Sequence, residues 1–383
     1  MRRIYFDNNA TTPVLPAVVE AMQPYWTEAF GNASSIHQRG QQARAAVEAS
    51  REQVAALIGA RASEMVFTSG GTEGDNTAIF GMATRGDHVI TSAIEHHAVL
   101  NACLRLKEAG VAVTIVGCDA NGVVDPAEVK AAVREETALI SVMMANNETG
   151  AVQPVAELAR IAHDAGAYFH TDAVQAAGKI PIDVEQIGCD LLTMAAHKMH
   201  GPQGVGALYV RRGTLLRSQQ VGGRHERGRR AGTENLPGII GFGRACELAR
   251  EWFAARSEAA MRALRDRLEQ SLCAQVPGAR INSRNAQRVP NTANILFEGI
   301  EGEGFVIAMD LKGVAVSTGA ACSSGAIEPS HVLVAMGLGE LSRGSIRFSL
   351  GKQNTAEEVD AVIALVPEVV HKLRELSPAW AGK

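Results

Sequence analysis

The strongest constraint on the fold is a regular alternation of two hydrophobic patterns, which starts near residue 63 and continues to about residue 250. Short apolar runs such as EMVFTS and DHVITS have the length and composition of buried strands, and most are followed by a segment with the length and spacing of a helix. Strands that alternate with helices favour a mostly parallel sheet with helices on both faces. We therefore predict an α/β fold with this sheet at the centre of a large domain.

The same pattern bounds the individual elements. Strands are predicted at 64–69, 87–92, 111–118, 137–145, 167–173, 189–198 and 204–212, and helices at 70–83, 97–110, 125–135 and 155–166. A long helical stretch from about Leu236 to Val276 follows and looks like a connector. Beyond it we expect a strand at 291–299, a helix at 302–313, a strand at 344–350 and a last helix from about Thr355 to Leu376. These elements indicate a smaller α+β domain.

The length of the chain, 383 residues, is too great for one small core, so at least two domains are expected. The large domain is predicted to span residues 15–255. The small domain is predicted to combine residues 1–14 with residues 256–383 and to carry a loop around Cys322.

Composition and charge exclude several classes of function. The sequence has 37 Lys and Arg against 41 Asp and Glu, which gives no reason to expect a nucleic-acid partner. No apolar run approaches the roughly 18 residues of a membrane helix, and the N-terminus lacks a signal-peptide core. The six cysteines form no C-x-x-C pair, so reduced thiols in the cytoplasm are the simplest interpretation. We expect a soluble cytoplasmic protein without a membrane partner.

One arginine cluster is open to two interpretations. It is either a solvated loop or a site for a small anion or an acidic neighbouring chain. Its members are Arg224, Arg227, Arg229 and Arg230.

Polar clusters follow three of the predicted strands, namely SGGTEGDN, NNETG and HTDAVQ. Ligands of open α/β sheets bind at the carboxyl ends of the strands, so these clusters are expected to meet in one site. In the first cluster, Gly71 and Thr72 stand between a strand and a helix, where backbone N–H groups favour an anion such as phosphate. The alternative there is an ordinary capped turn.

Two charged residues stand at the ends of other strands. Lys198 precedes a Gly-Pro break, and burial at such a position lowers the pKa of a lysine and makes it a nucleophile. Asp172 ends an apolar strand, where a buried carboxylate requires a cationic partner such as a protonated pyridine nitrogen. The alternatives are a surface lysine and an aspartate that caps a turn. His197 and His200 lack the spacing of a zinc helix, so no metal is expected.

A phosphate loop, an aspartate and a strand-end lysine are together what pyridoxal 5′-phosphate requires. A further candidate is Cys322, in the stretch STGAACSSGAIEPSH. Structural cysteines prefer apolar packing, whereas small flexible neighbours are typical of reactive ones. We therefore interpret Cys322 as a reactive thiol on a loop.

The motifs as a set resemble a known family. They are YFDNNATTP, FTSGGTEGDN, IEHHAV, NNETG, HTDAVQAAGK, AHKMHGPQGVGALYVRR, RRAGTEN, GAACSSG and IRFSLG, and they span nearly the whole chain in the order of the family. The chain resembles the cysteine desulfurases of the NifS/IscS type, in the class V aminotransferase group of fold-type I pyridoxal-phosphate enzymes. The stretches SHVLVAMGL and LSPAW lean towards the NifS branch associated with nitrogenase.

The resemblance implies roles for the residues around the cofactor ring. Lys198 corresponds to the lysine that holds the cofactor aldehyde, and Asp172 to the partner of the pyridine nitrogen. Gln175 corresponds to the donor to the ring oxygen. His96, counted with Lys198 and Cys322 as catalytic, corresponds to the imidazole that stacks on the ring, whereas His97 has no inherited role.

The resemblance also implies roles at the edges of the site. Asn147 corresponds to a residue that contacts cofactor and substrate, and Arg347 to the clamp for the substrate carboxylate. Thr233 corresponds to a phosphate ligand donated by the other subunit, which implies a homodimer. The phosphate-side residues of this subunit are Gly71, Thr72 and His197.

The implied reaction converts L-cysteine to L-alanine and leaves a persulfide on Cys322. The sulfur then passes to an acceptor protein such as an iron–sulfur scaffold, and the acceptor pathway (nitrogenase clusters, housekeeping clusters or tRNA thiolation) is left open. Alternatives are a selenocysteine lyase or an aminotransferase of the same fold, and a non-catalytic scaffold for iron–sulfur assembly.

The sequence departs from the family pattern at two positions. Ala195 stands where the family often has a serine, so one hydrogen bond to the phosphate is missing unless water or Thr193 substitutes. Gln203 replaces a lysine of the family's GPKG stretch.

Overall fold

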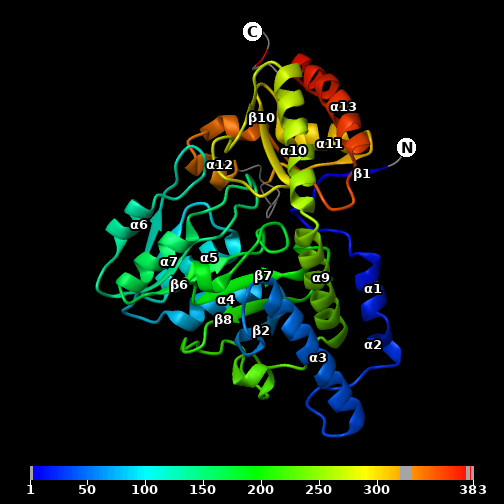
Figure 1. Ribbon diagram of the computed structural model, residues 1–383. Helices are drawn as coiled ribbons and strands as arrows, with labels where there is room; N and C mark the ends of the chain where they lie inside the picture. The colour runs from blue at the N-terminus through cyan, green and yellow to red at the C-terminus, as the bar shows by residue number, and fades with distance from the viewer. Residues whose placement is uncertain (1–2, 320–328, 377–379, 381–383) are drawn as a thin grey trace.

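A seven-stranded sheet forms the centre of the larger part of the molecule (Figure 1). The computed structural model describes residues 3–319, 329–376 and 380. The strand order is β2-β8-β7-β6-β5-β3-β4, and β8 runs antiparallel to both of its neighbours while the other adjacent pairs are parallel. The predicted mostly parallel sheet is thus confirmed. Its strands are β2 (Met65–Thr68), β3 (His88–Ser92), β4 (Ala112–Val116), β5 (Thr137–Ser141), β6 (Tyr168–Asp172), β7 (Leu191–Ala195) and β8 (Gly206–Val210).

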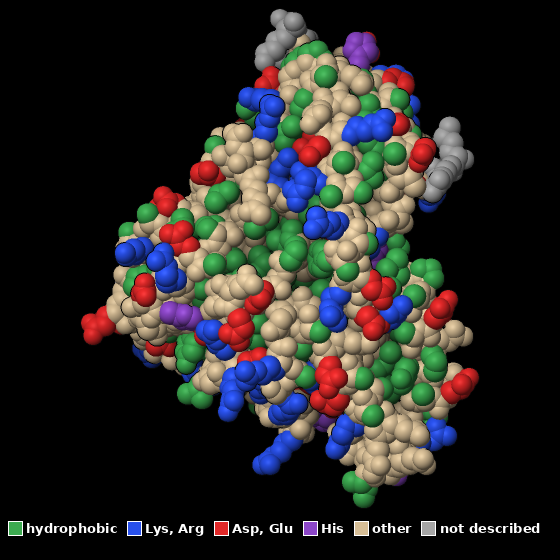
Figure 2. Space-filling view, viewed as in Figure 1, with side chains coloured by type: hydrophobic (Ala, Val, Ile, Leu, Met, Phe, Trp, Pro, Cys, Tyr) green, Lys and Arg blue, Asp and Glu red, His purple; other side chains and the backbone are tan. Residues whose placement is uncertain are grey.

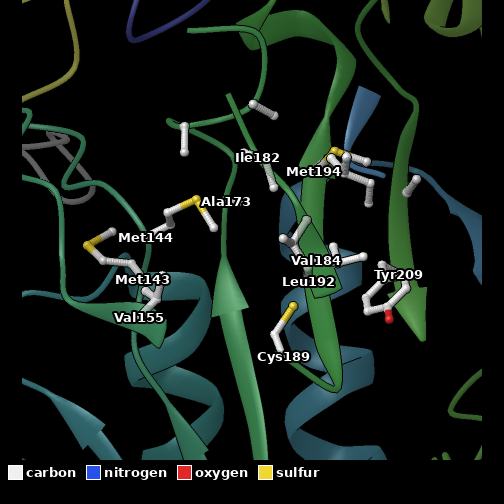
Figure 3. Packing of buried hydrophobic residues seen from close by; sticks show 14 of the residues in the cluster. Met143, Met144, Val155, Ala173, Ile182, Val184, Cys189, Leu192, Met194 and Tyr209 are labelled. Carbon is white, nitrogen blue, oxygen red and sulfur yellow. The ribbon is translucent and has the colours of Figure 1, made fainter. Parts of the chain in front are cut away.

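Helices cover both faces of this sheet. On one face, α4 (Gly71–Met82) and α5 (His97–Glu108) pack apolar side chains against strand residues such as Val89 and Leu208. On the other face lie α3 (Gln38–Leu57), α6 (Pro126–Ala132), α7 (Val155–Asp164) and α9 (Leu236–Ala254), over strand residues such as Leu192 and Tyr209 (Figure 3). Burial of these two apolar surfaces is the main stabilising term for the larger part.

The N-terminal helices are not predicted by the sequence pattern. They are α1 (Pro16–Met22), α2 (Pro24–Thr27) and α3, and α3 packs along α9. The buried face of α3 is formed largely by small side chains such as Ala43 and Val47, so its apolar stripe is narrow. A narrow stripe of this kind gives a weak periodic signal, although Ala, Gln, Glu and Arg all favour helix at these positions.

Two predicted strands are too long. The strand predicted at 137–145 ends at Ser141, and the strand predicted at 189–198 ends at Ala195. The residues from Val142 to Ala145 are buried and apolar, and so is Ala196 after the second strand, so periodicity could not separate them from the strands. The second case matters for the site, because Lys198 lies on a 3-10 turn (Ala196–Lys198) after β7 and not on the strand itself.

The helical stretch predicted from about Leu236 to Val276 is confirmed, and it consists of two helices. α9 ends at Ala254 and α10 (Ser257–Gln275) begins after Arg256, whose φ of +53° is incompatible with a continuous α-helix. The two helices pack in different parts of the molecule. α9 packs on α3, whereas α10 packs on α13 (Ala356–Glu375) and β10 (Thr292–Phe297).

The smaller part holds a three-stranded antiparallel sheet in the order β12-β10-β9. Its core includes Phe297, Phe305 and Phe348, which bring β10, α11 (Gly302–Leu311) and β12 (Ser345–Ser349) together with α10 and α13. The N-terminus joins this part, since β1 (Ile4–Tyr5) pairs in parallel with β11 (Val314–Ala315). The remaining elements are β9 (Ala279–Ile281), α8 (Val184–Ile187) and α12 (His331–Ala335).

The surface is of mixed charge. Figure 2 shows basic and acidic side chains interspersed over one face of the molecule, as the near balance of charges in the sequence leads us to expect. Among the residues that the structure describes, no helix combines the length and the apolar character needed to cross a bilayer.

Candidate active site

A cleft of about 380 Å³ lies between the large sheet and β12 of the smaller part. Segments that follow β2, β3, β5, β6 and β7 line it, as expected for the carboxyl ends of strands in an α/β sheet. Most of the site residues predicted from the sequence meet here. They are Gly71, Thr72, His96, Asn147, Asp172, Gln175, His197, Lys198 and Arg347.

Two predicted residues do not line this cleft. Cys322 lies outside the described residues, although Gly319, the last described residue before it, is part of the cleft wall. Thr233 lines a separate cavity of about 100 Å³ beside Ser69 and Arg230. Within one chain, therefore, the cleft is built without Thr233.

Lys198 reaches into the cleft from the turn after β7. Its Nζ donates to the carbonyl oxygens of Asn9 and Ala10, each at 2.7 Å. Desolvation and the positive charge of Arg347 lower the pKa of Lys198 to about 8, whereas the carboxylates of Asp172 and Asp7 partly oppose this shift. An amine with such a pKa is a good nucleophile and proton acceptor near neutral pH.

Asp172 ends β6 and is buried at the floor of the cleft. Its Oδ1 accepts a hydrogen bond from the backbone N–H of Val174 at 2.8 Å. Desolvation raises the pKa of Asp172 to about 6, and the Val174 N–H and the Lys198 ammonium oppose the rise. A buried carboxylate of this kind is suited to a cationic ligand atom, because such a partner would compensate its desolvation.

The N-terminus of α4 forms one end of the cleft. Gly70 precedes this helix and offers no side-chain cap, so the first N–H groups of α4 face the cleft region beside Gly71 and Thr72. A Cβ at Gly71 would come within 2.8 Å of Val174 Cγ2, so the close approach of these segments requires glycine. A free helix N-terminus in a cleft with a lysine is a suitable place for a phosphate group.

The structure answers the question about Ala195 and Thr193. Ala195 lines the cleft, whereas Thr193 lies behind it and is fully buried. The hydroxyl of Thr193 is 3.0 Å from Nε2 of His170 and also hydrogen bonds to Asp75. Thr193 is therefore engaged elsewhere and does not replace a hydroxyl at position 195.

His96 and His197 both line the cleft as neutral imidazoles. His96 caps α5, since its Nδ1 accepts from the N–H of Ala98 at 3.1 Å. Partial desolvation, followed by the charge of Lys198, lowers the pKa of both His96 and His197 to about 4. A neutral ring at His96 is able to stack on a flat ligand without adding charge.

Gln203 also receives a structural explanation. Its Nε2 donates to the Thr11 hydroxyl at 3.3 Å, and that hydroxyl is 3.2 Å from Nδ1 of His197. Gln203 thus supports His197 through Thr11. The second histidine of the HKMH stretch, His200, is turned away from this group, because its Nδ1 lies 3.0 Å from the Pro13 carbonyl oxygen.

Arg347 extends from β12 into the cleft and is buried. Its Nη2 donates to Asp7 at 2.7 Å and its Nη1 donates to the Asn147 carbonyl at 3.0 Å. Its Nε has no hydrogen-bond partner within the described part of the chain. An unpaired buried N–H on a guanidinium that lines a cleft is an available donor for a carboxylate.

The arginine cluster belongs to the loop before α9, and ion pairs connect this loop to α4 and α3. Arg230 forms a two-point ion pair with Glu73 on α4, at 2.7 and 3.1 Å. Glu226 forms a buried two-point pair with Arg51 on α3, at 2.6 and 2.9 Å. Of the two interpretations, a purely solvated loop is therefore wrong for Arg230, because Glu73 binds it.

Several cleft residues were not singled out from the sequence. Asn9 and Ala10 accept from Lys198, and Asp75 is a second buried carboxyl beside the cleft. Asn9 and Asp7 lie in the stretch YFDNNATTP, which belongs to the recognised motifs, so the motif itself was the available signal. Other cleft residues without an assigned role are Met143, Val174, Ser317 and Gly319.

Known proteins resemble this chain over almost its whole length. The model of the aminotransferase class-V family matches residues 4–362. Cysteine desulfurase IscS from Anaeromyxobacter is 52% identical over 385 residues, which cover 98% of this chain and 95% of the relative. A solved NifS-like protein has a TM-score of 0.89 at 39% identity and covers 97% of this chain and 100% of its own. SspA in complex with cysteine has a TM-score of 0.79 at 35% identity, with 91% and 98% covered.

Proposed function

The chain belongs to the aminotransferase class-V family as a cysteine desulfurase of the NifS/IscS type, and from this premise we propose how its cleft carries out the reaction. The substrate is L-cysteine, in keeping with the names of the relatives and with the cysteine bound to SspA. The proposal covers the cofactor, the roles of the cleft residues, the thiol that accepts the sulfur and the assembly of the enzyme.

We propose pyridoxal 5′-phosphate as the cofactor, and the residues of the cleft fit it. The uncapped N-terminus of α4 beside Gly71 and Thr72 would hold the phosphate, with His197 on the same side. Asp172, whose burial calls for a cation, would pair with the pyridinium nitrogen. Gln175 would donate to the ring oxygen, Asn147 would contact the cofactor and the substrate, and His96 would stack on the ring. When bound, the cofactor supplies an electron-withdrawing ring that eases loss of the Cα proton of the substrate.

The chain's own residues then have distinct tasks. Arg347 binds the substrate carboxylate, for which its planar fork and unpaired Nε are suited. Lys198, first the attachment point of the cofactor, takes up the Cα proton at Nζ, which the lowered pKa of about 8 makes possible near neutral pH. The walls of the cleft hold His96 neutral, so it adds no positive charge that would raise the cost of Lys198 protonation.

The sulfur goes to Cys322 in this proposal. The Cys322 thiolate attacks the substrate sulfur, so an S–S bond forms while the C–S bond breaks and its electron pair goes to the substrate carbon. Proton uptake at that carbon gives L-alanine and leaves a persulfide on Cys322. In this proposal, the thiolate belongs to a loop of small residues, which lets it enter the cleft first and meet an acceptor protein afterwards. Gly319, the last described residue before Cys322, is part of the cleft wall.

The assembly and location are also part of the proposal. A homodimer would allow Thr233 of the second subunit to reach the phosphate end, in line with its place outside the cleft of its own chain. The acceptor is proposed to be a protein such as an iron–sulfur scaffold, with the enzyme in the cytoplasm. The division into residues 15–255 and residues 1–14 with 256–383 stays a prediction, which the break between α9 and α10 supports.

The meeting of Lys198, Asp172 and Arg347 in one cleft is the observation that carries the proposal. The test is incubation of the pyridoxal-phosphate-loaded enzyme with L-cysteine, followed by mass spectrometry of the peptide that holds Cys322. We expect an added sulfur atom on Cys322 and alanine in solution without any keto acid. Cys322→Ala should keep the visible absorption of the cofactor but form no persulfide. Alanine formation that depends on a keto acid would identify an aminotransferase instead.

A further inference from the structure

A second lysine, Lys179, is buried directly behind the cleft and has no role in the reaction described above. It lies seven residues after Asp172, on the turns that follow β6, and only 6% of its surface is exposed. Gly178 before it has a φ of +73°, and a Cβ there would come within 2.8 Å of Met199. The chain is therefore held tightly where Lys179 turns inward.

The described residues around Lys179 include no counter-ion. Among the described residues, no carboxylate forms an ion pair with Lys179, and the charged or titratable groups that interact with it are Lys198, Arg347, His197 and His200. Desolvation, followed by the charges of Lys198 and Arg347, lowers the pKa of Lys179 well below its usual range. Burial of a lysine among other basic groups costs free energy. The hydrogen bonds that Lys179 makes must therefore compensate this cost.

The partners of Lys179 are two amide oxygens. Its Nζ donates to Asn9 Oδ1 at 2.9 Å and to Gln175 Oε1 at 2.5 Å. Lys179 is the donor in both bonds, so both amides turn their oxygen towards it. Gln175 then directs its Nε2 away from Lys179, and this nitrogen donates to the Asn9 carbonyl at 3.0 Å. The same carbonyl accepts from Lys198 Nζ.

The two amides differ in how much they depend on Lys179. Asn9 Oδ1 also accepts from Asn291 Nδ2 at 3.0 Å, so it would keep a donor without Lys179. Gln175 Oε1 has Lys179 as its one hydrogen-bond donor within the described residues. Loss of Lys179 would therefore orphan a buried oxygen on Gln175 alone, and that amide would turn to find another donor.

We propose that Lys179 is a positioning residue, which holds Gln175 so that its Nε2 stays on the Asn9 carbonyl shared with Lys198 and remains available to the cofactor. This inference rests on the proposed function, in which Gln175 donates to the cofactor ring oxygen. A donor at that oxygen stabilises its anionic form. Displacement of Gln175 therefore raises the pH at which the bound cofactor changes its visible absorption.

The test is a pH titration of the visible absorption of the loaded, full-length enzyme. Lys179→Met should raise the midpoint by about one pH unit, because a shift of this size corresponds to the loss of one hydrogen bond to a charged group. The same variant should lower kcat/KM. Lys352→Met is the matched control. Lys352 lines the same small cavity as Lys179, its pKa is also lowered by burial, and it stacks on Trp252 without contact to Gln175. Its replacement should leave the midpoint unchanged.

A double-mutant comparison separates position from charge. Gln175→Met should raise the midpoint by itself, and addition of Lys179→Met to that variant should cause no further shift. A further shift of the full size would show that Lys179 acts by its charge and would overturn the inference, as would an unshifted midpoint in Lys179→Met alone. The comparison decides even where the single Lys179→Met variant fails to fold.

The remaining outcomes are also decisive. The double variant replaces both polar partners by apolar groups of similar shape and leaves no oxygen orphaned at this pair, so it should fold. If the double variant does not fold, Lys179 must support more of the structure than Gln175 alone, and this result would contradict the inference. Failure of the cofactor assignment, the part of the proposed function on which this inference rests, would be recognised separately, because the wild-type protein would then show no visible cofactor band at all.

Discussion

Arg347 and Asp7 form an ion pair of 2.7 Å between guanidinium Nη2 and carboxylate, and this pair joins the N-terminal segment to β12 at the mouth of the cleft. The pair leaves Nε of Arg347 without a partner in the described structure, while Nη1 donates to the Asn147 carbonyl. Asp7 thus fixes one arm of the guanidinium and balances part of its charge. In the proposed function, the rest of the planar group binds the substrate carboxylate.

Replacement of Arg347 by lysine should therefore weaken substrate binding without loss of the cofactor. A lysine keeps the charge but cannot contact Asp7, Asn147 and a carboxylate in one plane. We expect KM for L-cysteine to rise roughly 10- to 100-fold, because this rise corresponds to the free energy of one or two hydrogen bonds to a charged group. Steady-state kinetics and the visible spectrum measure the two properties. Arg244→Lys on the outer side of α9 is the control, and an unchanged KM in Arg347→Lys would contradict the assignment.

The lowered pKa of Lys198 should be visible in how the apo protein takes up its cofactor. Only the neutral amine attacks an aldehyde, so the rate of uptake follows the deprotonated fraction of Lys198. We expect the rate to rise with pH and to level off above about pH 8, well below the usual lysine value of 10.5. Stopped-flow absorbance with pyridoxal phosphate measures this profile. A rate that still climbs tenfold per pH unit near pH 10 would show that Arg347 and burial do not depress this pKa.

Asp75 makes the stability of the protein depend on pH. Burial, followed by the charge of Asp172, raises the pKa of Asp75 well above its usual value of 3.8. The folded state then keeps a proton that the unfolded chain has lost, so the free energy of unfolding falls as pH rises from about 4 towards the folded pKa. Asp75→Asn keeps the neutral shape and should reduce this slope, which makes the variant relatively more stable at higher pH.

Urea denaturation of the wild type and of Asp75→Asn, at about pH 5 and at about pH 8, measures how much the free energy of unfolding changes between the two pH values. Asp164→Asn, exposed at the end of α7, controls for the change of carboxyl to amide. If Asp75→Asn lost as much stability between the two pH values as the wild type, Asp75 would not be the buried proton carrier.

The Arg51–Glu226 pair should be one of the largest single contributions to the stability of the phosphate end. Glu226 also accepts from the N–H of Phe67 on β2 at 2.9 Å, just before the loop that leads to Gly71. Glu226→Ala would remove the two-point partner of the buried Arg51 guanidinium and would leave the Phe67 N–H without its acceptor, at a cost of about 3–5 kcal/mol. Glu48→Ala is the matched control, since Glu48 contacts the same Arg51 from a half-exposed position and should cost below about 1 kcal/mol. Equal losses in urea denaturation would refute this ranking.

The main features of the fold and the site could be predicted because they depend on local pattern. Apolar runs of strand length located β2 to β8, and parallel strands bring their carboxyl ends together, so Lys198 and Asp172 were expected in one site. Motifs then supplied their roles. The narrow apolar stripe of α3 and the break at Arg256 gave no such local signal.

Other parts of the site depend on contacts between distant segments. Asn9 hydrogen bonds to Thr292, Asn147 and Gln175, which are far apart in the sequence, so its central place appears only after folding. The same holds for the support of Gln175 by Lys179 and for the link from Gln203 to His197 through Thr11. Periodicity reports which face of an element is buried, but not which polar groups meet across elements.

The missing hydroxyl at position 195 yields the last prediction. Ala195 lines the cleft on the strand that leads to Lys198, and the nearby Thr193 hydroxyl is already bound to His170 and Asp75. Ala195→Ser would add a donor at the phosphate end at almost no change in volume. The net free energy of the added hydrogen bond, about 0.5–1.5 kcal/mol, corresponds to a roughly 2- to 10-fold slower loss of cofactor. Dialysis of the loaded enzyme, followed by visible absorbance, measures this rate. Ala196→Ser, one residue further and outside the cleft lining, should bring no gain; an equal gain there would mean that position 195 does not face the phosphate.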